Sequence, residues 1–392
     1  MQHGPLAGVT VLDLTSYIAG PFAASLLADL GADIIKVEAP EGDMMRHYPS
    51  SVEGESRVFL GVNRGKKAIV IDLKSEDGKA VMRGLIEKAD VFIENFRPSV
   101  PPRLGLDYET LKAQNPRLIY CALTGYGESG PQRDNAGYDQ VLQAMTGIAV
   151  FHGAGINAPP LTVPGSIVDF YAASMAALGI AAALHQRAVT GQGQYIATSL
   201  LSASLAMQAG RFVNVDGEPR DIDRELKPGK LAAIHPTKDG YIYISAHTQA
   251  FWKNLCRILE LDGLAADPRY DNIRKRSEHA DELLPIIHGA LAKRTAKEWE
   301  KLMAGDVPCA VAQPIEDAFD HPQIIAEGLV AHFPHQKLGG YLGLSQPIKF
   351  AACDGVTPIG APALGQHTDE ILERLGWSAE TIAKMRANGA VA

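Results

Sequence analysis

The sequence predicts an α/β fold with a large domain built on a parallel sheet and a smaller α+β domain. Over the first 125 residues, short apolar runs alternate with amphipathic segments, which is typical of parallel strands covered by helices on both faces. A different pattern begins near residue 220, where an Asp-Gly turn precedes an alternating run and charged helices follow. A length of 392 residues also favours two or three domains.

The elements of the first part are expected in the following order. Residues 9–14 predict a short buried strand, and Pro21 is suited to the first position of a helix that continues over 22–30. Further strands are expected at 33–37, 68–73, 89–94 and 118–123, with a helix over 78–88. In a sheet of this kind, ligands usually bind at the carboxyl ends of the strands.

In the second part, residues 241–245 predict a strand of a hairpin, 249–304 predict amphipathic helices, and the tail ends in helices after His367. The expected organisation is a large domain over 1–213, a linker over 214–232, a small α+β domain over 233–330, a second linker over 331–349, and a C-terminal segment over 350–392 that returns to the large domain.

Composition argues against several classes of protein. The chain is 46% hydrophobic and 21% charged, which excludes general disorder, and its net charge of −8 disfavours nucleic acid as a partner. The four cysteines form no CxxC pair and the histidines show no metal-binding spacing, so neither a disulfide framework nor a metal site is expected. The longest apolar run, near 170–184, is about 15 residues long, against the ~20 that a membrane span needs. The N-terminus has no signal-peptide pattern, so a reduced, cytoplasmic setting is expected.

Asp169 stands out because it is the only formal charge between Asp139 and Arg187. The stretch over 170–184 is apolar almost all round and predicts a buried helix, where a carboxylate is costly unless it is compensated. One role for Asp169 is an N-cap that accepts hydrogen bonds from free backbone N–H groups. The other is a buried nucleophile, which the helix N-terminus keeps ionised by about 0.3–2 kcal/mol while burial raises its pKa. The two roles are compatible, and the residues alone leave both open.

Two further patterns concern phosphate or nucleotide binding. The run from Gly125 to Gly130 matches GxGxxG after a strand, but no apolar helix follows and no acidic residue stands about 20 positions later, so NAD binding is not expected. A glycine turn that brings backbone N–H groups against a ligand remains expected. Basic residues cluster in the first 105 positions, either as a phosphate site near strand ends or as a solvated rim. They are Lys36, Arg46, Arg64, Lys66, Lys67, Lys74, Arg97 and Arg103.

Taken in order, blocks spread over nearly the whole chain resemble the family III CoA-transferases, the group that contains formyl-CoA transferase and carnitine CoA-transferase. The blocks are Leu6 to Leu14, Ala19-Gly-Pro21, Leu30 to Glu38, Gly42-Asp43, Asn63 to Lys67, Glu94 to Pro98, Arg103-Leu-Gly105, Gly125-Tyr-Gly127, Gly130-Pro131, Gly137-Tyr-Asp139, Thr190 to Gln194 and Gly365 to Asp369. Each block is weak alone, whereas their order and spacing together are specific.

The resemblance implies a fold, a site and partners. It implies a Rossmann-like large domain, a small domain, and two chains interlocked as a homodimer. It implies that Asp169 is the catalytic residue, and that acyl-CoA and a carboxylic acid are the substrates with no tightly bound cofactor. The positions that match the CoA site of the family are Ile18, Ala19, Ile71, Asp72, Leu73, Lys74, Asn95, Phe96, Arg97, Arg103, Ala136, Gly137 and Tyr138.

Three departures from formyl-CoA transferase bear on substrate and mechanism. A glutamine before its Ala-Gly-Pro is Ile18 here, an arginine that contacts CoA is Ala39, and its glycine-run lid is replaced by Lys227 to Lys230. Formate and oxalate are therefore not expected as substrates. The resemblance to the family implies succinyl-CoA or another dicarboxylic thioester as the donor.

The implied chemistry passes through covalent intermediates on Asp169, an aspartyl mixed anhydride and then an aspartyl-CoA thioester. The alternative within the family is an acyl-CoA racemase or epimerase, which carries a histidine where Tyr138 stands here. A phenol, with an ordinary pKa near 10, is a poor proton shuttle at neutral pH, so transfer is preferred. A non-catalytic CoA-binding protein and a nicotinamide oxidoreductase are the alternatives from other classes.

Overall fold

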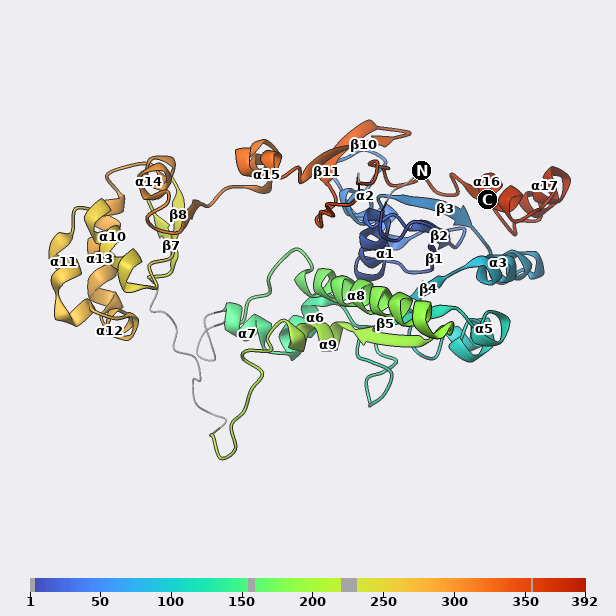
Figure 1. The fold of residues 1–392 in the computed structure, drawn as a ribbon, viewed down its shortest axis with the longest axis horizontal. Helices are drawn as coiled ribbons and strands as arrows, with labels where there is room; N and C mark the ends of the chain where they lie inside the picture. Colours follow the sequence, from blue (N-terminus) through green and yellow to red (C-terminus); the bar gives the residue numbers. More distant parts are fainter. Residues whose placement is uncertain (1–3, 154–158, 220–230, 354) are drawn as a thin grey trace. The chain divides into compact units, whose positions relative to one another are not determined.

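The computed structural model describes residues 4–153, 159–219, 231–353 and 355–392 (Figure 1). The chain divides into two compact units, and each is described by itself. Unit 1 comprises Met1–Asn214 together with Gln323–Ala392, and unit 2 comprises Val215–Pro322.

Unit 1 is built on a six-stranded sheet whose strands are all parallel, as the sequence predicts. The strands are β1 (Thr10–Asp13), β2 (Asp33–Glu38), β3 (Lys66–Val70), β4 (Val91–Glu94), β5 (Ile119–Thr124) and β6 (Tyr195–Ser199). Their spatial order is β3-β2-β1-β4-β5-β6, so the chain reverses its direction of winding between β1 and β4. That reversal leaves a crevice at the carboxyl ends of β1 and β4, where ligands of doubly wound sheets bind.

Helices cover both faces of this sheet because successive strand residues point to opposite sides. Val11, Ile93 and Cys121 pack on one face against α1 (Ala19–Asp29), α8 (Ile167–Thr190) and α9 (Leu200–Ala206). Their neighbours Leu12, Phe92 and Tyr120 belong to the hydrophobic core of the other face. The helices of that face are α3 (Glu76–Lys88), α5 (Tyr108–Gln114) and the C-terminal pair α16 (Thr368–Arg374) and α17 (Ala379–Ala387).

Helix α8 differs from the buried helix that the apolar stretch over 170–184 predicts. Small residues such as Ala172, Ala173 and Ala176 bury one face, while Leu178 and Val189 are 71% and 78% exposed. The helix extends to 24 residues and is, by length and composition, apolar enough to cross a membrane, a property shared with core helices of soluble proteins. The length argument against a membrane span is therefore wrong for this helix. Its packing against α1 and the sheet accounts for only one side of it.

Unit 2 is the smaller α+β unit. Its three-stranded antiparallel sheet has the order β7 (Ala233–Pro236), β8 (Tyr241–Ile244), β9 (Cys309–Val311). Its helices are α10 (Gln249–Ile258), α11 (Asp262–Ala266), α12 (Ile273–Glu278), α13 (Ala280–Leu291) and α14 (Ala296–Met303), with 3₁₀ turns at Pro268–Tyr270 and Ile315–Asp320. Trp252, Trp299 and Leu283 lie at the centre of its hydrophobic core.

The segment over 331–349, expected to be a linker, instead forms an antiparallel hairpin of β10 (Val330–His335) and β11 (Gly339–Leu344) after the short helix α15 (Pro322–Ala326). The hairpin belongs to unit 1, where the Tyr341 hydroxyl donates to the carbonyl oxygen of Leu60, in α2 (Arg57–Val62). The expected linker over 214–232 includes residues 220–230, and these, with the Lys227 to Lys230 segment, lie outside the described residues. The short elements of unit 1 are a 3₁₀ turn at Met44–His47, α4 (Pro101–Leu104), α6 (Asp139–Met145) and α7 (Ile148–His152).

Candidate active site

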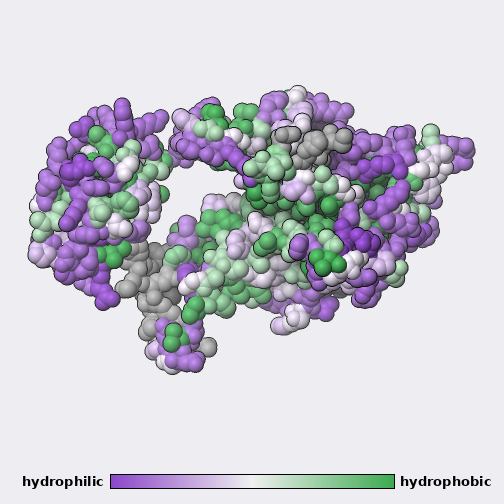
Figure 2. All heavy atoms as spheres, in the orientation of Figure 1, coloured by the Kyte–Doolittle hydropathy of each residue, from purple (hydrophilic) through white to green (hydrophobic). Residues whose placement is uncertain are grey.

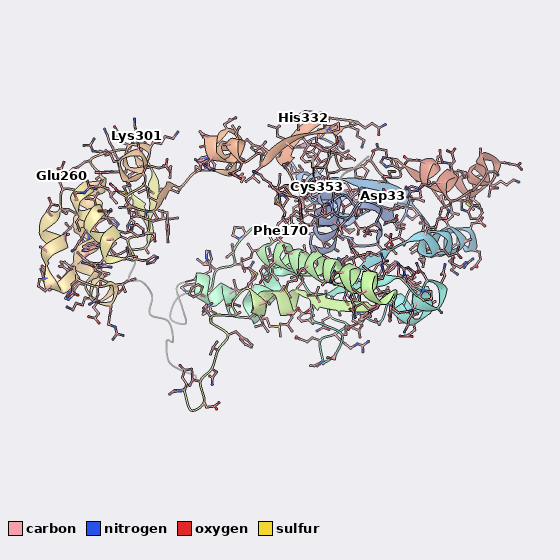
Figure 3. All side chains as sticks on the ribbon, viewed as in Figure 1. Asp33, Phe170, Glu260, Lys301, His332 and Cys353 are labelled. Carbon is pink, nitrogen blue, oxygen red and sulfur yellow. The ribbon has the colours of Figure 1, made fainter. Side chains whose placement is uncertain are left out.

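A cavity of about 650 Å³ opens at the carboxyl edge of the sheet in unit 1. Loops after β1, β4 and β5 and the N-terminal end of α8 form it, which is where the reversal in strand order predicts a ligand site. Figure 3 labels Phe170, the residue that follows Asp169, at this end of α8. The predicted site residues that line the cavity are Ile18, Ala19, Asn95, Phe96, Arg97, Ala136, Gly137, Tyr138 and Asp169.

A second cavity of about 360 Å³ lies beside the first, and Phe96 lines both. It is formed by the loop after β2 and the segment after β3. This second cavity collects the remaining predicted positions Ile71, Asp72, Leu73 and Lys74. Arg103 is not among the residues that line either cavity, because its exposed guanidinium turns back to donate to the carbonyl oxygen of Ser99.

The turn after β1 forms one wall of the larger cavity and is held rigidly. Asn95 bridges it to β4, accepting from the Ser16 backbone N–H at 3.0 Å and donating to the Ser16 carbonyl oxygen at 2.7 Å. The next residue, Tyr17, has a φ of 69°, which is unfavourable for a side chain of that size. Its backbone N–H donates to the buried carboxylate of Asp43, and that hydrogen bond helps to hold the strained conformation.

Tyr17 and Tyr138 approach each other across the cavity. Their ring centroids are 5.8 Å apart in an edge-to-face arrangement. The interaction of its hydroxyl with Tyr138, together with burial, raises the pKa of Tyr17, so its phenol stays protonated at neutral pH. Tyr17 therefore presents a neutral hydroxyl group to a ligand.

Asp169 occupies the third position of α8 and does not act as its N-cap. The N-cap is Ser166, whose φ of 58° is left-handed and whose side chain makes no capping hydrogen bond. The backbone N–H groups of Val168 and Asp169 instead donate to Asp139 Oδ2, at 2.6 and 3.2 Å. The N-cap alternative for Asp169 is therefore wrong, because Asp139 performs that role from α6 and leaves the Asp169 carboxyl to line the cavity.

The environment of the Asp169 carboxyl favours its neutral form more than water does. Burial raises its pKa to about 7, repulsion from Asp139 adds to the rise, and a hydrogen bond from the Ser166 side chain opposes it. With this pKa about half of the groups are ionised at pH 7, and the carboxylate predominates above it. A carboxylate of raised basicity is a better nucleophile, and a sheltered position protects a reactive acyl intermediate from water.

The glycine turn after β5 permits a close approach of two backbone segments beneath the cavity. A Cβ atom at Gly137 would lie 2.6 Å from the Cα of Gly125, closer than side-chain carbons come to other atoms. Gly125, Gly137 and Tyr138 all line the cavity. The expected glycine-rich turn is therefore present, and its bare backbone faces the ligand space.

Three basic residues that were candidates for a phosphate site or a solvated rim are neither. Lys36, Arg64 and Lys66 are buried and form ion pairs with Asp43, Asp29 and Asp13 respectively. Asp13 is on β1, Asp29 is the last residue of α1, and Asp43 follows β2.

Sequence reasoning did not single out Tyr17, Asp139 or Gln143 as site residues. One signal was available for Asp139, which is the last charge before the uncharged stretch that leads to Asp169. Among the described residues, no group of three His, Cys, Asp or Glu side chains is close enough to hold a metal ion.

Comparison with known proteins agrees with this geometry. The model of CoA-transferase family III matches residues 6–368. A succinate–glutarate CoA-transferase of Agrobacterium fabrum is 33% identical over 391 residues, covering 95% of this chain and 96% of the relative. An acetyl-CoA:oxalate CoA-transferase of Acetobacter aceti is 34% identical over 377 residues, covering 93% and 94%. The crystal structure of a CaiB/BaiF family protein from Brucella suis has a TM-score of 0.83 at 32% identity, covering 95% of this chain and 100% of that one. The chain therefore belongs to CoA-transferase family III and is an enzyme of that family.

Proposed function

We propose that the chain moves CoA from an acyl-CoA to a carboxylic acid through covalent intermediates on Asp169. The observation that carries this proposal is a partly buried carboxyl group of raised pKa in the wall of a cavity at the switch point of the sheet. Direct exchange of thioester for acid has a high barrier, and a covalent intermediate divides it into easier steps.

Each step conserves atoms and charge. A carboxylate oxygen of Asp169 attacks the donor thioester carbonyl, and the C–S bond breaks to leave a mixed anhydride and CoA thiolate. The thiolate attacks the aspartyl carbonyl, which releases the donor acid as its carboxylate and leaves an aspartyl-CoA thioester. The acceptor carboxylate then attacks this thioester, which expels CoA thiolate and forms a second mixed anhydride. The thiolate attacks the acceptor acyl carbonyl of that anhydride, which gives the new acyl-CoA and restores the Asp169 carboxylate.

The two neighbouring cavities support a binding mode for the thioester. The smaller cavity, with Lys74 beside strand ends, suits the nucleotide part of CoA, and the larger cavity suits the thioester and the acid. Backbone N–H groups of the glycine turns are suited to stabilise the tetrahedral oxyanions, and removal of one such donor typically costs ~10²–10³ in rate.

We propose dicarboxylic acids as the substrate class. Relatives are named for succinate, glutarate and oxalate, all of them dicarboxylic acids. The phenol pair of Tyr17 and Tyr138 and the guanidinium of Arg97 are groups that accommodate a second carboxylate in the larger cavity. Oxalate, which is not expected from Ile18, is retained in the substrate panel because a relative of similar identity is named for it.

The racemase alternative predicts proton exchange at Cα without CoA transfer. Among the described residues that line the cavity there is no histidine, and Tyr138 stands where the resemblance places the racemase histidine. Incubation of an acyl-CoA in deuterium oxide separates the alternatives, since label at Cα without transfer contradicts the proposal.

We further propose that the chain works as a homodimer, with interlocked chains by resemblance to the family. Support comes from the outward face of α8, where Tyr171, Leu178 and Val189 are 40%, 71% and 78% exposed. Figure 2 shows hydrophobic atoms gathered over the part of unit 1 that holds α8. Apolar surface of this kind usually marks an association site. Light scattering of the purified chain tests this, and a monomer at micromolar concentration contradicts it.

A cytoplasmic setting stays a prediction.

The deciding experiment joins a substrate screen to covalent trapping. Succinyl-CoA is offered with a panel of dicarboxylic and monocarboxylic acids, and turnover is quenched with borohydride before peptide mapping. We expect the reduced adduct at Asp169 and a loss of at least ~10⁴-fold in transfer for Asp169→Asn. Asp107→Asn is the matched control, because Asp107 caps α5 and lines neither cavity, and asparagine caps equally well. An adduct at another residue overturns the assignment.

A further inference from the structure

Helix α6 supplies two buried side chains, Asp139 and Gln143, that are one helical turn apart and join three segments of the site. Asp139 Oδ1 accepts from Gln143 Nε2 at 2.5 Å, while Asp139 Oδ2 accepts from the first turn of α8. Gln143 continues the network to Val163, accepting its backbone N–H at 2.7 Å and donating to its carbonyl oxygen at 2.9 Å. We call Asp139 and Gln143 the α6 clamp.

The α6 clamp supplies the hydrogen-bond acceptor for the first backbone N–H groups of α8, which the local sequence of α8 does not supply. A helix begins with backbone N–H groups that have no partner within the helix, and a side chain at the N-cap usually accepts them. At the start of α8, the N-cap residue Ser166 makes no such hydrogen bond. Asp139 replaces it from another helix, so the N–H group of Asp169 itself is fixed by Asp139.

The clamp also fixes the loop that leads into α8. Gly165 and Ser166 both have left-handed backbone conformations, with φ of 90° and 58°. Pro164, Gly165 and Ser166 line the cavity together with Asp169. Gln143 holds the backbone of Val163 by two hydrogen bonds, so the N-terminal end of this strained loop is fixed.

We propose that Asp139 and Gln143 are positioning residues for the transfer reaction, which orient Asp169 by holding its backbone and the loop before it. The inference rests on the proposed function, since it requires Asp169 to be the nucleophile. Displacement of a reacting group by about 1 Å can cost ~10²-fold in rate, so positioning is worth a measurable effect. Neither residue needs to touch the substrate for this role.

Charge adds a second effect that a purely structural role lacks. Asp139 supplies the electrostatic part of the rise in the pKa of Asp169. The other charged or titratable side chains that line the same cavity are Tyr17, Tyr48, Arg97, Arg133 and Tyr138. A variant without the Asp139 charge therefore lowers the pKa of Asp169 and moves the acid limb of the kcat profile to lower pH.

The hydrogen-bond geometry makes Asp139→Asn an informative substitution. Gln143 cannot turn its amide round, because its oxygen accepts from Val163 N–H and its nitrogen donates to Val163 O. An asparagine amide that still accepts from α8 then directs its NH₂ group at the NH₂ group of Gln143. The variant keeps the volume of the side chain, removes its charge and loses one hydrogen bond.

The experiment measures kcat, KM for acyl-CoA and the pH profile of kcat for Asp139→Asn and Gln143→Met. Asp139→Asn is expected to lose about 10²-fold in kcat, with KM within about threefold and the acid limb at lower pH. Gln143→Met is expected to lose about tenfold in kcat with the limb unmoved, and it serves as the second variant if Asp139→Asn does not fold.

Asn115→Leu is the matched control, because Asn115 also holds a loop by hydrogen bonds but lies before β5, at the opposite edge of the sheet. Its side chain donates to Ile86 O and Ala89 O and accepts from Arg117 N. It is expected to keep full kcat. Normal kcat and an unmoved limb in Asp139→Asn, beside an inactive Asp169→Asn, overturn this inference alone. Full transfer by Asp169→Asn overturns the proposed function and the inference together.

Discussion

The ammonium nitrogen of Lys66 lies 2.8 Å from Asp13 Oδ2, and neither side chain has any exposed surface. Lys66 is on β3 and Asp13 is on β1, so the ion pair passes across β2 beneath the turn that leads to the active site. The same ammonium donates to Asn63 Oδ1 and to the carbonyl oxygen of Pro21 in the first turn of α1. All three of its protons are used, which ties the start of α1 to the edge of the sheet.

Lys66→Met is expected to destabilise unit 1 by about 3–5 kcal/mol, because it removes the ion-pair partner of the buried Asp13 carboxylate. Urea unfolding at pH 7 measures the change. Lys67→Met is the control one residue away, where an ion pair with Glu370 is partly exposed and its removal is expected to cost less than about 1 kcal/mol. Equal losses in the two variants contradict the prediction.

The buried ion pairs also show where sequence reasoning stops. Lys36 and Lys66 look like surface or phosphate-binding residues along the chain, because their partners are separated from them by 7 and 53 residues. The parallel register of β1, β2 and β3 brings Lys66 to Asp13, whereas the loop after β2 returns Asp43 to Lys36. Apolar periodicity predicts which segments are strands, but it carries no information on which charges meet beneath them.

The elements themselves were predicted unevenly for physical reasons. Strands β1 to β5 were predicted because buried parallel strands are continuous apolar runs. Strand β6 (Tyr195–Ser199) was missed because it is half-polar, and the hairpin over 330–344 because its glycines resemble a linker. Within the site, Asp169 was found from its isolation in an uncharged stretch, whereas Gln143 has no distinguishing signal until the loop at Val163 is seen to rest on it.

Removal of the Asp169 charge is expected to stabilise the folded chain at alkaline pH. Burial raises the pKa of Asp169 from 3.8 to about 7, so the folded state holds this proton more tightly than the unfolded state does. The stability contributed by the protonated group is complete near pH 4 and lost as the pH rises to about 7. Asp169→Asn is therefore expected to gain on the order of a few kcal/mol at pH 8 and much less at pH 5. Urea unfolding at the two pH values measures this, and an equal change at both contradicts it.

The rate of transfer is expected to increase as Asp169 ionises, whereas the stability of the fold decreases. Attack on a thioester requires the Asp169 carboxylate, so kcat/KM rises with pH through about 7 and then levels off. Initial rates with succinyl-CoA between pH 5 and 9 in a buffer series of constant ionic strength measure the limb. A rate that is flat from pH 5 upward means that Asp169 does not titrate in this range in the free enzyme.

Unit 2 carries a pH-sensitive contact of its own. His235 Nε2 lies 3.0 Å from the carbonyl oxygen of Leu231 and must donate to it, so His235 Nδ1 is the acceptor from His288 Nε2 at 3.1 Å. Burial lowers the pKa of His235, and repulsion from His288 lowers it further against the hydrogen bond to Leu231. The folded state therefore binds this proton less tightly than the unfolded state.

The stability of unit 2 is consequently expected to fall as the pH decreases below about 6.5, the ordinary pKa of histidine, because the unfolded chain takes up protons that the fold resists. Trp252 and Trp299 report on this unit, since two of the three tryptophans of the chain lie in its core. His235→Gln keeps a donor and an acceptor but does not titrate, so its unfolding midpoint in urea is expected to change less between pH 7 and pH 5 than that of the unaltered chain. His247→Gln, at an exposed position, is expected to retain the full pH dependence. If the slope with pH survives in His235→Gln, another group is responsible for it.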